Sequence, residues 1–149
     1  AEKQLEINPT MRLAIEMKGW CVGMKGDWKN ALEYFQEVHR LANHPLKSLA
    51  PLGYAYAKIG EREKAFEAIN KLEQRQAQEP DLAVDGDLLM VWWALGDKEK
   101  TFYYVNNCFK KGLNSIYYYL EYPMMFGIKE YPEVIELIEK NSSPASAKH

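Results

Sequence analysis

The sequence of 149 residues has little of what marks a secreted, membrane-spanning or nucleic-acid-binding protein. Its two cysteines, Cys21 and Cys108, are too few for a disulfide framework, and we expect both to be buried, reduced thiols. No apolar run approaches the ~18–20 residues of a membrane span. A net charge of -2 provides no basic surface for nucleic acid or for an anionic membrane. These absences predict a cytoplasmic protein whose partners include neither nucleic acid nor membrane.

We expect no signal peptide at the start of the sequence. Residues 1–7 are mixed and charged, which is unlike the apolar core of a signal peptide. Because the sequence begins with Ala1 rather than methionine, we expect it to be a fragment of a longer protein.

Residues that carry catalysis or bind metals are sparse. Two of the three histidines, His39 and His44, are five residues apart on either side of a predicted helix end, whereas zinc on one helix face uses the i, i+4 spacing. The glycines are scattered rather than gathered into a phosphate-binding loop. Three glutamates have the spacing of a solvated helix face: Glu133, Glu136 and Glu139. The sequence therefore predicts no catalytic residue, no metal site and no cofactor.

Glycine turns divide the chain at regular intervals. Gly26, Gly60 and Gly96 lie 34 and 36 residues apart, and glycine supplies the left-handed conformation that ends a helix. Between these turns, apolar residues recur at helical spacing, and no segment shows the alternation of a strand. Pro51 is tolerated only in a first helical turn, so its helix begins near Ser48 or kinks just before the proline. The predicted helices span 11–24, 28–41, 48–59, 62–76, 85–95 and 98–111, and the fold class is all-α.

A two-helix unit of ~34 residues that repeats is typical of a helical solenoid, and these units resemble tetratricopeptide repeats (TPRs). That family places small residues where the two helices of a unit cross. The matching pairs in this chain are Gly19–Ala31, Gly53–Ala65 and Leu89–Thr101. The resemblance implies a right-handed superhelix of antiparallel helix pairs, with repeats over 12–45, 46–81 and 82–113.

Residues 114–140 are expected to form a closing segment that caps the last repeat. Its last helix has an apolar side at Val134, Ile135, Leu137 and Ile138. Residues 1–140 would then form one domain, followed by a polar, disordered tail over 141–149.

Residues 45–140 are also similar to the C-terminal repeats of bacterial signalling proteins, including adenylate cyclases and winged-helix transcription regulators. Phe126 and Tyr131 depart from that pattern, because acids are common at these two positions. The similarity implies a module of a larger bacterial signalling protein. Any catalytic activity, such as that of a nucleotide cyclase, would lie in an upstream domain.

Aromatic residues are more abundant than a core of this size usually needs, at 13% of the chain with 4 Trp and 10 Tyr. Adjacent residues of a helix point ~100° apart, so Trp92 is expected in the core and Trp93 at the inner surface. We expect part of the run 117–119 to pack against the closing segment. In TPR proteins the first helices line the concave face, and this resemblance implies a partner-binding groove of seven residues: Glu16, Trp20, Met24, Tyr54, Lys58, Met90 and Trp93.

The sequence thus predicts a protein-interaction module whose concave groove binds an extended segment of a partner or of the parent protein. The contacts would be mainly apolar, with Glu16 and Lys58 as polar ends, and binding would depend little on salt. Two alternatives stay open. A small-molecule sensor would have a closed cavity in place of an open groove. A purely structural or dimerisation module would bury its aromatic residues in a self-interface. The partner and the oligomeric state are left open.

Overall fold

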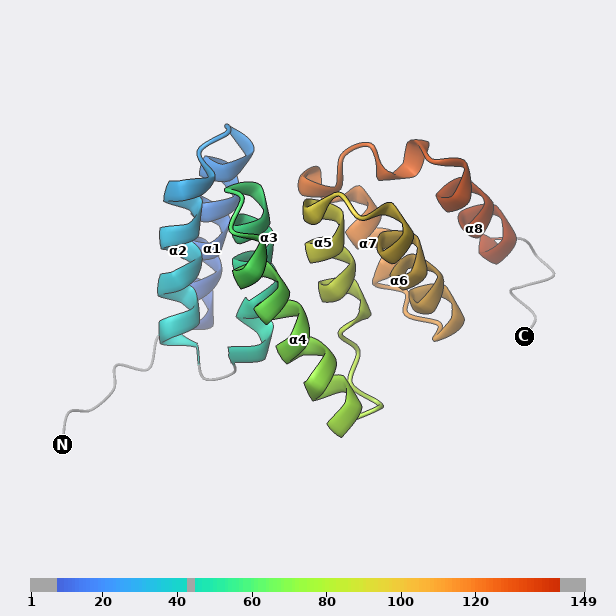
Figure 1. Cartoon of the computed structure of the whole chain (residues 1–149), viewed down its shortest axis with the longest axis horizontal. Helices are drawn as coiled ribbons and strands as arrows, with labels where there is room; N and C mark the ends of the chain where they lie inside the picture. The colour runs from blue at the N-terminus through green and yellow to red at the C-terminus, as the bar shows by residue number, and fades with distance from the viewer. Residues whose placement is uncertain (1–7, 43–44, 143–149) are drawn as a thin grey trace.

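The computed structural model describes residues 8–42 and 45–142, which form helices joined by turns and contain no β-strand. This confirms the all-α fold class. The first six α-helices form three pairs that lie side by side (Figure 1). They are α1 (Pro9–Met24), α2 (Trp28–Leu41), α3 (Leu49–Lys58), α4 (Arg62–Gln78), α5 (Asp85–Leu95) and α6 (Lys98–Lys110). Each boundary lies within two residues of the prediction, and a 3₁₀ turn, η1 (Pro45–Ser48), precedes α3.

The three glycine turns, which recur at regular intervals along the chain, share one structure. Gly26, Gly60 and Gly96 have φ of 102°, 86° and 80°, the left-handed region that side chains other than glycine rarely adopt. In each turn the next residue's amide donates to the carbonyl oxygen five residues earlier, over 3.2, 2.9 and 3.2 Å. Asp27 and Asp97 then cap the following helices by accepting from backbone amides.

Close helix crossings join the pairs into one core. A Cβ atom on Gly19 would lie 2.5 Å from Cε1 of Phe35, one helical turn beyond the predicted partner Ala31. A Cβ on Gly53 would lie 2.9 Å from Cγ2 of Val91 and 3.2 Å from Cβ of Ala68. Gly53 therefore lets α3 approach both α4 of its own pair and α5 of the next pair. The three helix pairs contact one another along the chain, while the repeat arrangement and the right-handed superhelix of a TPR protein stay predictions.

The closing segment folds back along the stack before it ends on α6. It contains α7 (Ile116–Glu121), η2 (Pro123–Met125), η3 (Ile128–Glu130) and α8 (Pro132–Ser142). Helix α7 packs on α5 and α6, η2 reaches α1, and α8 packs on α6 with Val134 buried. Figure 1 shows α8 beside α6 at the opposite end of the stack from α1 and α2.

Three details of the closing segment differ from the predictions or qualify them. Ile135 is exposed, because it lies on the solvent side of α8 rather than with Val134. Residues 141 and 142 belong to α8, where the Asn141 side chain donates to the carbonyl oxygen of Leu137 over 2.7 Å. The rest of the predicted tail lies outside the described residues. Within the run 117–119, Tyr119 packs on the residues that follow α7, with its ring 5.3 Å from that of Tyr122, whereas Tyr118 is exposed.

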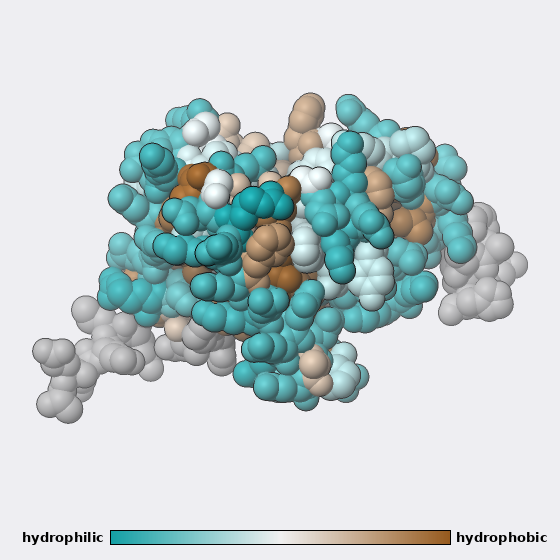
Figure 2. Space-filling view, in the orientation of Figure 1, coloured by the Kyte–Doolittle hydropathy of each residue, from teal (hydrophilic) through white to brown (hydrophobic). Residues whose placement is uncertain are grey.

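Hydrophilic residues dominate the face that Figure 2 shows, and apolar residues form small separate patches on it. Among the described residues, no helix combines the length and the hydrophobicity that a bilayer span requires.

We predict that Ala65→Leu destabilises the fold by ~1–3 kcal/mol, because Ala65 is fully buried and the added volume would overpack its site. The matched control is Ala77→Leu, the same change at an exposed position of the same helix α4, which should cost less than ~0.5 kcal/mol. Urea unfolding of both variants measures the difference. Equal losses would contradict the packing described for α4.

Candidate functional site

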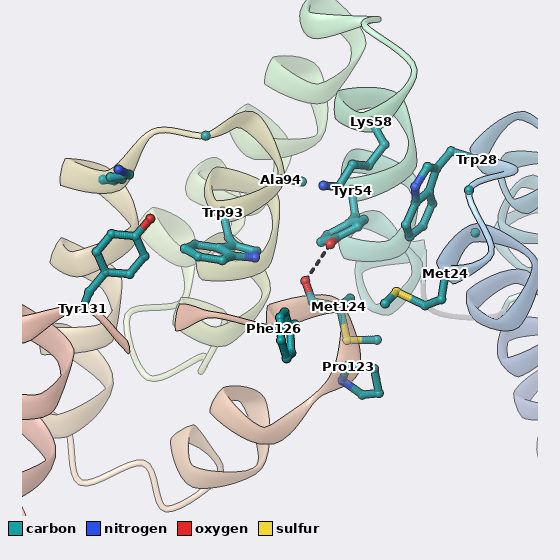
Figure 3. A pocket seen from close by; sticks show the side chains of 14 residues that line it. Met24, Trp28, Tyr54, Lys58, Trp93, Ala94, Pro123, Met124, Phe126 and Tyr131 are labelled. Carbon is teal, nitrogen blue, oxygen red and sulfur yellow. Dashed lines mark hydrogen bonds between the residues drawn. The ribbon is translucent and has the colours of Figure 1, made fainter. Parts of the chain in front are cut away.

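The chain's own closing segment crosses the face formed by α1, α3 and α5, which we call the concave face after the groove predicted there. We call residues 122–126 of this segment the strap. The hydroxyl of Tyr54, on α3, donates a hydrogen bond of 2.6 Å to the backbone carbonyl oxygen of Met124 (Figure 3). Met124 thereby lies between Tyr54 and Pro123 in the middle of the face. This contact joins residues 70 positions apart in the chain.

The strap divides the predicted groove into two cavities that share Met24, Pro123 and Met124 as walls. The first, which we call the lysine cavity, has a volume of about 470 Å³ and contains Tyr54, Lys58 and Trp93 from the predicted set. The second, the acid cavity, has a volume of about 530 Å³ and contains Glu16, Trp20 and Met90. All seven predicted residues therefore lie on one face, but in two compartments.

Three of the predicted groove residues are core residues rather than open anchors. Trp20, Tyr54 and Met90 are 6%, 2% and 5% exposed. The ring of Trp20 lies 4.8 Å from that of Phe35 and 5.1 Å from that of Tyr54, so aromatic neighbours cover most of it. The strap lies against Tyr54, whose hydroxyl donates to the backbone of Met124. Trp93 is only half-buried, with its ring 6.0 Å from that of Tyr131, and it points into the lysine cavity.

The lysine cavity combines aromatic rings with two ammonium groups. The Nζ atom of Lys58 lies 5.6 Å from the ring centre of Tyr54, and that of Lys98 lies 4.9 Å from the ring centre of Tyr131. The residues that line this cavity include no aspartate or glutamate. Its potential is therefore positive, which favours an anionic group beside apolar surface.

The residues of this cavity that sequence reasoning missed include four with large or charged side chains: Trp28, Lys98, Phe126 and Tyr131. Trp28 and Lys98 begin second helices, whereas the predicted groove drew only on first helices. Phe126 and Tyr131 carried a signal, since the predicted resemblance gave acids as common at both positions. Phe126 is 85% exposed at the rim of the cavity.

Two carboxylates, Glu16 and Asp87, face the acid cavity among mostly apolar neighbours. The pKa of Asp87 is raised to about 6, mainly by burial and in smaller part by the charge of Glu16, against a hydrogen bond of 3.2 Å from the Tyr119 hydroxyl that lowers it. Burial also raises the pKa of Glu16, against a hydrogen bond with the indole of Trp20. The sequence analysis placed Asp87 only in the first turn of the predicted helix 85–95. It did not predict the cavity that this side chain faces.

Other reactive groups have structural roles. Asp85 is fully buried, and its Oδ2 atom accepts from Lys111 over 2.7 Å and from Gln76 over 3.2 Å. Burial raises the pKa of the Cys108 thiol to about 12, so this cysteine stays protonated at neutral pH. The prediction that Cys21 is buried is wrong, because its side of α1 borders the acid cavity and is exposed. No cluster suited to a metal ion occurs among residues 8–42 and 45–142.

Comparisons of the chain with protein-family models, curated proteins and solved structures find no match. The resemblance to TPR proteins and the signalling context that it implies therefore stay predictions.

We predict that Asp87→Asn stabilises the fold at pH 7.5, on the order of 1–2 kcal/mol, because it removes a charge that burial disfavours. The folded-state pKa is raised, so the wild type gains stability as pH falls from about 6 toward the ordinary value of 3.8. The advantage of the variant should therefore disappear below about pH 4. Asp81→Asn, at an exposed aspartate, is the control. Urea unfolding from pH 4 to 8 measures both, and a constant difference between wild type and Asp87→Asn would contradict this assignment.

We predict that Tyr54→Phe loosens the strap. The change removes the hydrogen bond to Met124 and leaves the ring in place, and a bond of this kind contributes about 0.5–1.5 kcal/mol. Amide hydrogen exchange should become faster over 122–130 and stay unchanged in α2. The control is Tyr118→Phe, at an exposed tyrosine of α7. If the strap exchanged at the same rate in wild type and Tyr54→Phe, the hydrogen bond would not hold it.

Proposed function

We propose that this protein is a peptide-binding module without catalytic activity of its own, and that the lysine cavity holds an extended apolar segment of a partner protein. The setting is the one that the resemblance implies, a TPR-like module of a larger cytoplasmic signalling protein. The observation that carries the proposal is the strap, a segment of this chain that already lies on the concave face through a main-chain hydrogen bond.

The strap supports the proposal because its binding mode suits peptides in general. The Tyr54 hydroxyl donates to the backbone carbonyl oxygen of Met124, so this hydrogen bond does not depend on the side chain at that position. Pro123 and Met124 line the cavities on both sides of the strap. A second segment that ran beside the strap would meet the same kind of surface in the lysine cavity.

Exposed aromatic surface also supports a partner at this cavity. Phe126 projects from the rim with most of its ring in water, and Trp93 is half-buried on the cavity wall. Exposed apolar groups that gather at one place commonly mark an interaction site. Aromatic anchors in such sites often contribute ~2 kcal/mol or more to binding.

The charges of the lysine cavity indicate what charge the partner segment carries. Lys58 and Lys98 have no acidic residue beside them in the cavity lining. A partner segment with one carboxylate, from a side chain or a chain terminus, would complement them. Because these lysines are exposed, we expect a moderate salt dependence, larger than the sequence suggested.

Selection of random octapeptides on the full chain tests this proposal. The selected peptides should be rich in aromatic and aliphatic residues and carry a carboxylate. Their affinity should fall at least about tenfold for Trp93→Ala and be unchanged for Tyr103→Ala, an exposed aromatic residue outside the cavity. Circular dichroism confirms that each variant is folded.

Two variants that each remove one lysine charge test the electrostatic part of the proposal without a change in the packing of the core. Lys58→Gln should weaken the selected peptides several-fold, whereas Lys71→Gln, which removes the same charge from the exposed side of α4, should not. Peptides that bind all four variants equally, or a selection without enrichment, would contradict the proposal.

A further inference from the structure

The acid cavity is the more enclosed and more apolar of the two compartments. Four parts of the chain surround it: α1, the turn η1 with the start of α3, α5, and α7 with the strap. Its volume of about 530 Å³ falls within the ~300–1,000 Å³ that is typical of small-molecule sites. The strap separates this cavity from the lysine cavity, to which the peptide is assigned.

The α1 wall of the cavity leaves apolar side chains in water. Leu13 and Met17 are 57% and 51% exposed, and Met24 is exposed on the next turns of the same helix. Across the cavity lie Met90 and Met124. Methionine side chains are flexible and polarizable, so a wall of this composition adapts to apolar ligands of different shapes. Burial of these side chains by a ligand would be favourable.

The charged and titratable groups that face the cavity come from every element around it. Glu16 is on α1, Asp87 on α5 and Lys47 on η1, and their sum at neutral pH is one negative charge. Lys47 is exposed and, within the part of the chain that the structure describes, forms no ion pair with either carboxylate. The remaining titratable groups that line the cavity are Cys21, Tyr119 and Tyr122.

A cation would relieve the cost of holding two carboxylates in an apolar cavity. Isolated charges away from water are unfavourable unless they are paired. The indole of Trp20 and the rings of Tyr119 and Tyr122 line the same space and add aromatic surface that attracts cations. An anionic ligand would meet Glu16 and Asp87 and be repelled.

We infer that the acid cavity is a binding site for a small apolar ligand that carries one ammonium group. Glu16 and Asp87 receive the ammonium, and the methionine-rich wall covers the hydrocarbon part. The inference does not rest on the peptide proposal, since it uses the opposite side of the strap.

The affinities of three phenyl compounds of matched size for the wild-type chain test which ligand charge the cavity prefers. The compounds are 4-phenylbutylammonium, 4-phenylbutanol and 4-phenylbutyrate, and calorimetry measures each affinity. At pH 7.5 the ammonium should bind at least about tenfold more tightly than the alcohol, and the carboxylate more weakly than either. At pH 5 the ammonium should lose affinity several-fold, because the Asp87 carboxylate is then largely protonated.

Isosteric variants locate the site. Asp87→Asn keeps an acceptor for the Tyr119 hydroxyl, and Glu16→Gln keeps the length of the side chain, so each should reduce the preference for the ammonium several-fold while the alcohol binds as before. Glu133→Gln removes the same charge from the exposed face of α8 and should change nothing.

Equal binding of ammonium and alcohol, or a preference that both cavity variants retain, would overturn the inference. Trp93→Ala separates the two proposals, because it should weaken peptides in the lysine cavity and leave the ammonium affinity unchanged.

Discussion

The hydrogen bond from Tyr54 to the Met124 carbonyl oxygen is the interaction on which the arrangement of this protein depends. The ring of Tyr54 lies 5.1 Å from those of Trp20 and Trp28, which come from the first helix pair, while its hydroxyl holds the closing segment. One buried side chain of α3 therefore connects the first pair, the second pair and the strap. Burial also strongly raises the pKa of its phenol, so the hydroxyl remains a donor throughout the physiological range.

Because the strap is fixed at its middle, the concave face becomes two sites of opposite charge. Lys58 and Lys98 lie on one side, and Glu16 and Asp87 lie on the other. The shared wall of Met24, Pro123 and Met124 means that a ligand on one side contacts the same segment as a ligand on the other. The closing segment thus has two structural roles, since it packs on α6 through α8 and forms the partition between the cavities.

The local features of the fold could be predicted from the sequence, and the partition could not. Glycine at Gly26, Gly60 and Gly96 determines each turn through its own backbone, so the helix boundaries followed from short-range signals. The strap has no such signal. It is a 3₁₀ turn without helical periodicity, and its contact with Tyr54 joins residues 70 positions apart. The repeat register brought all seven predicted residues to one face, but it could not indicate which of them another segment buries. Cys21 was misplaced because α1 carries apolar residues on more than one side, so its periodicity does not identify the buried face.

Nuclear Overhauser contacts in the full chain test the central claim, that the strap lies across the concave face against Tyr54. The account predicts contacts from the Tyr54 ring protons to Met124 and Pro123, together with contacts to Trp20 and Trp28. Contacts from Tyr54 to the two tryptophans alone, with residues 122–126 at random-coil chemical shifts, would show an open concave face and contradict the division into two cavities.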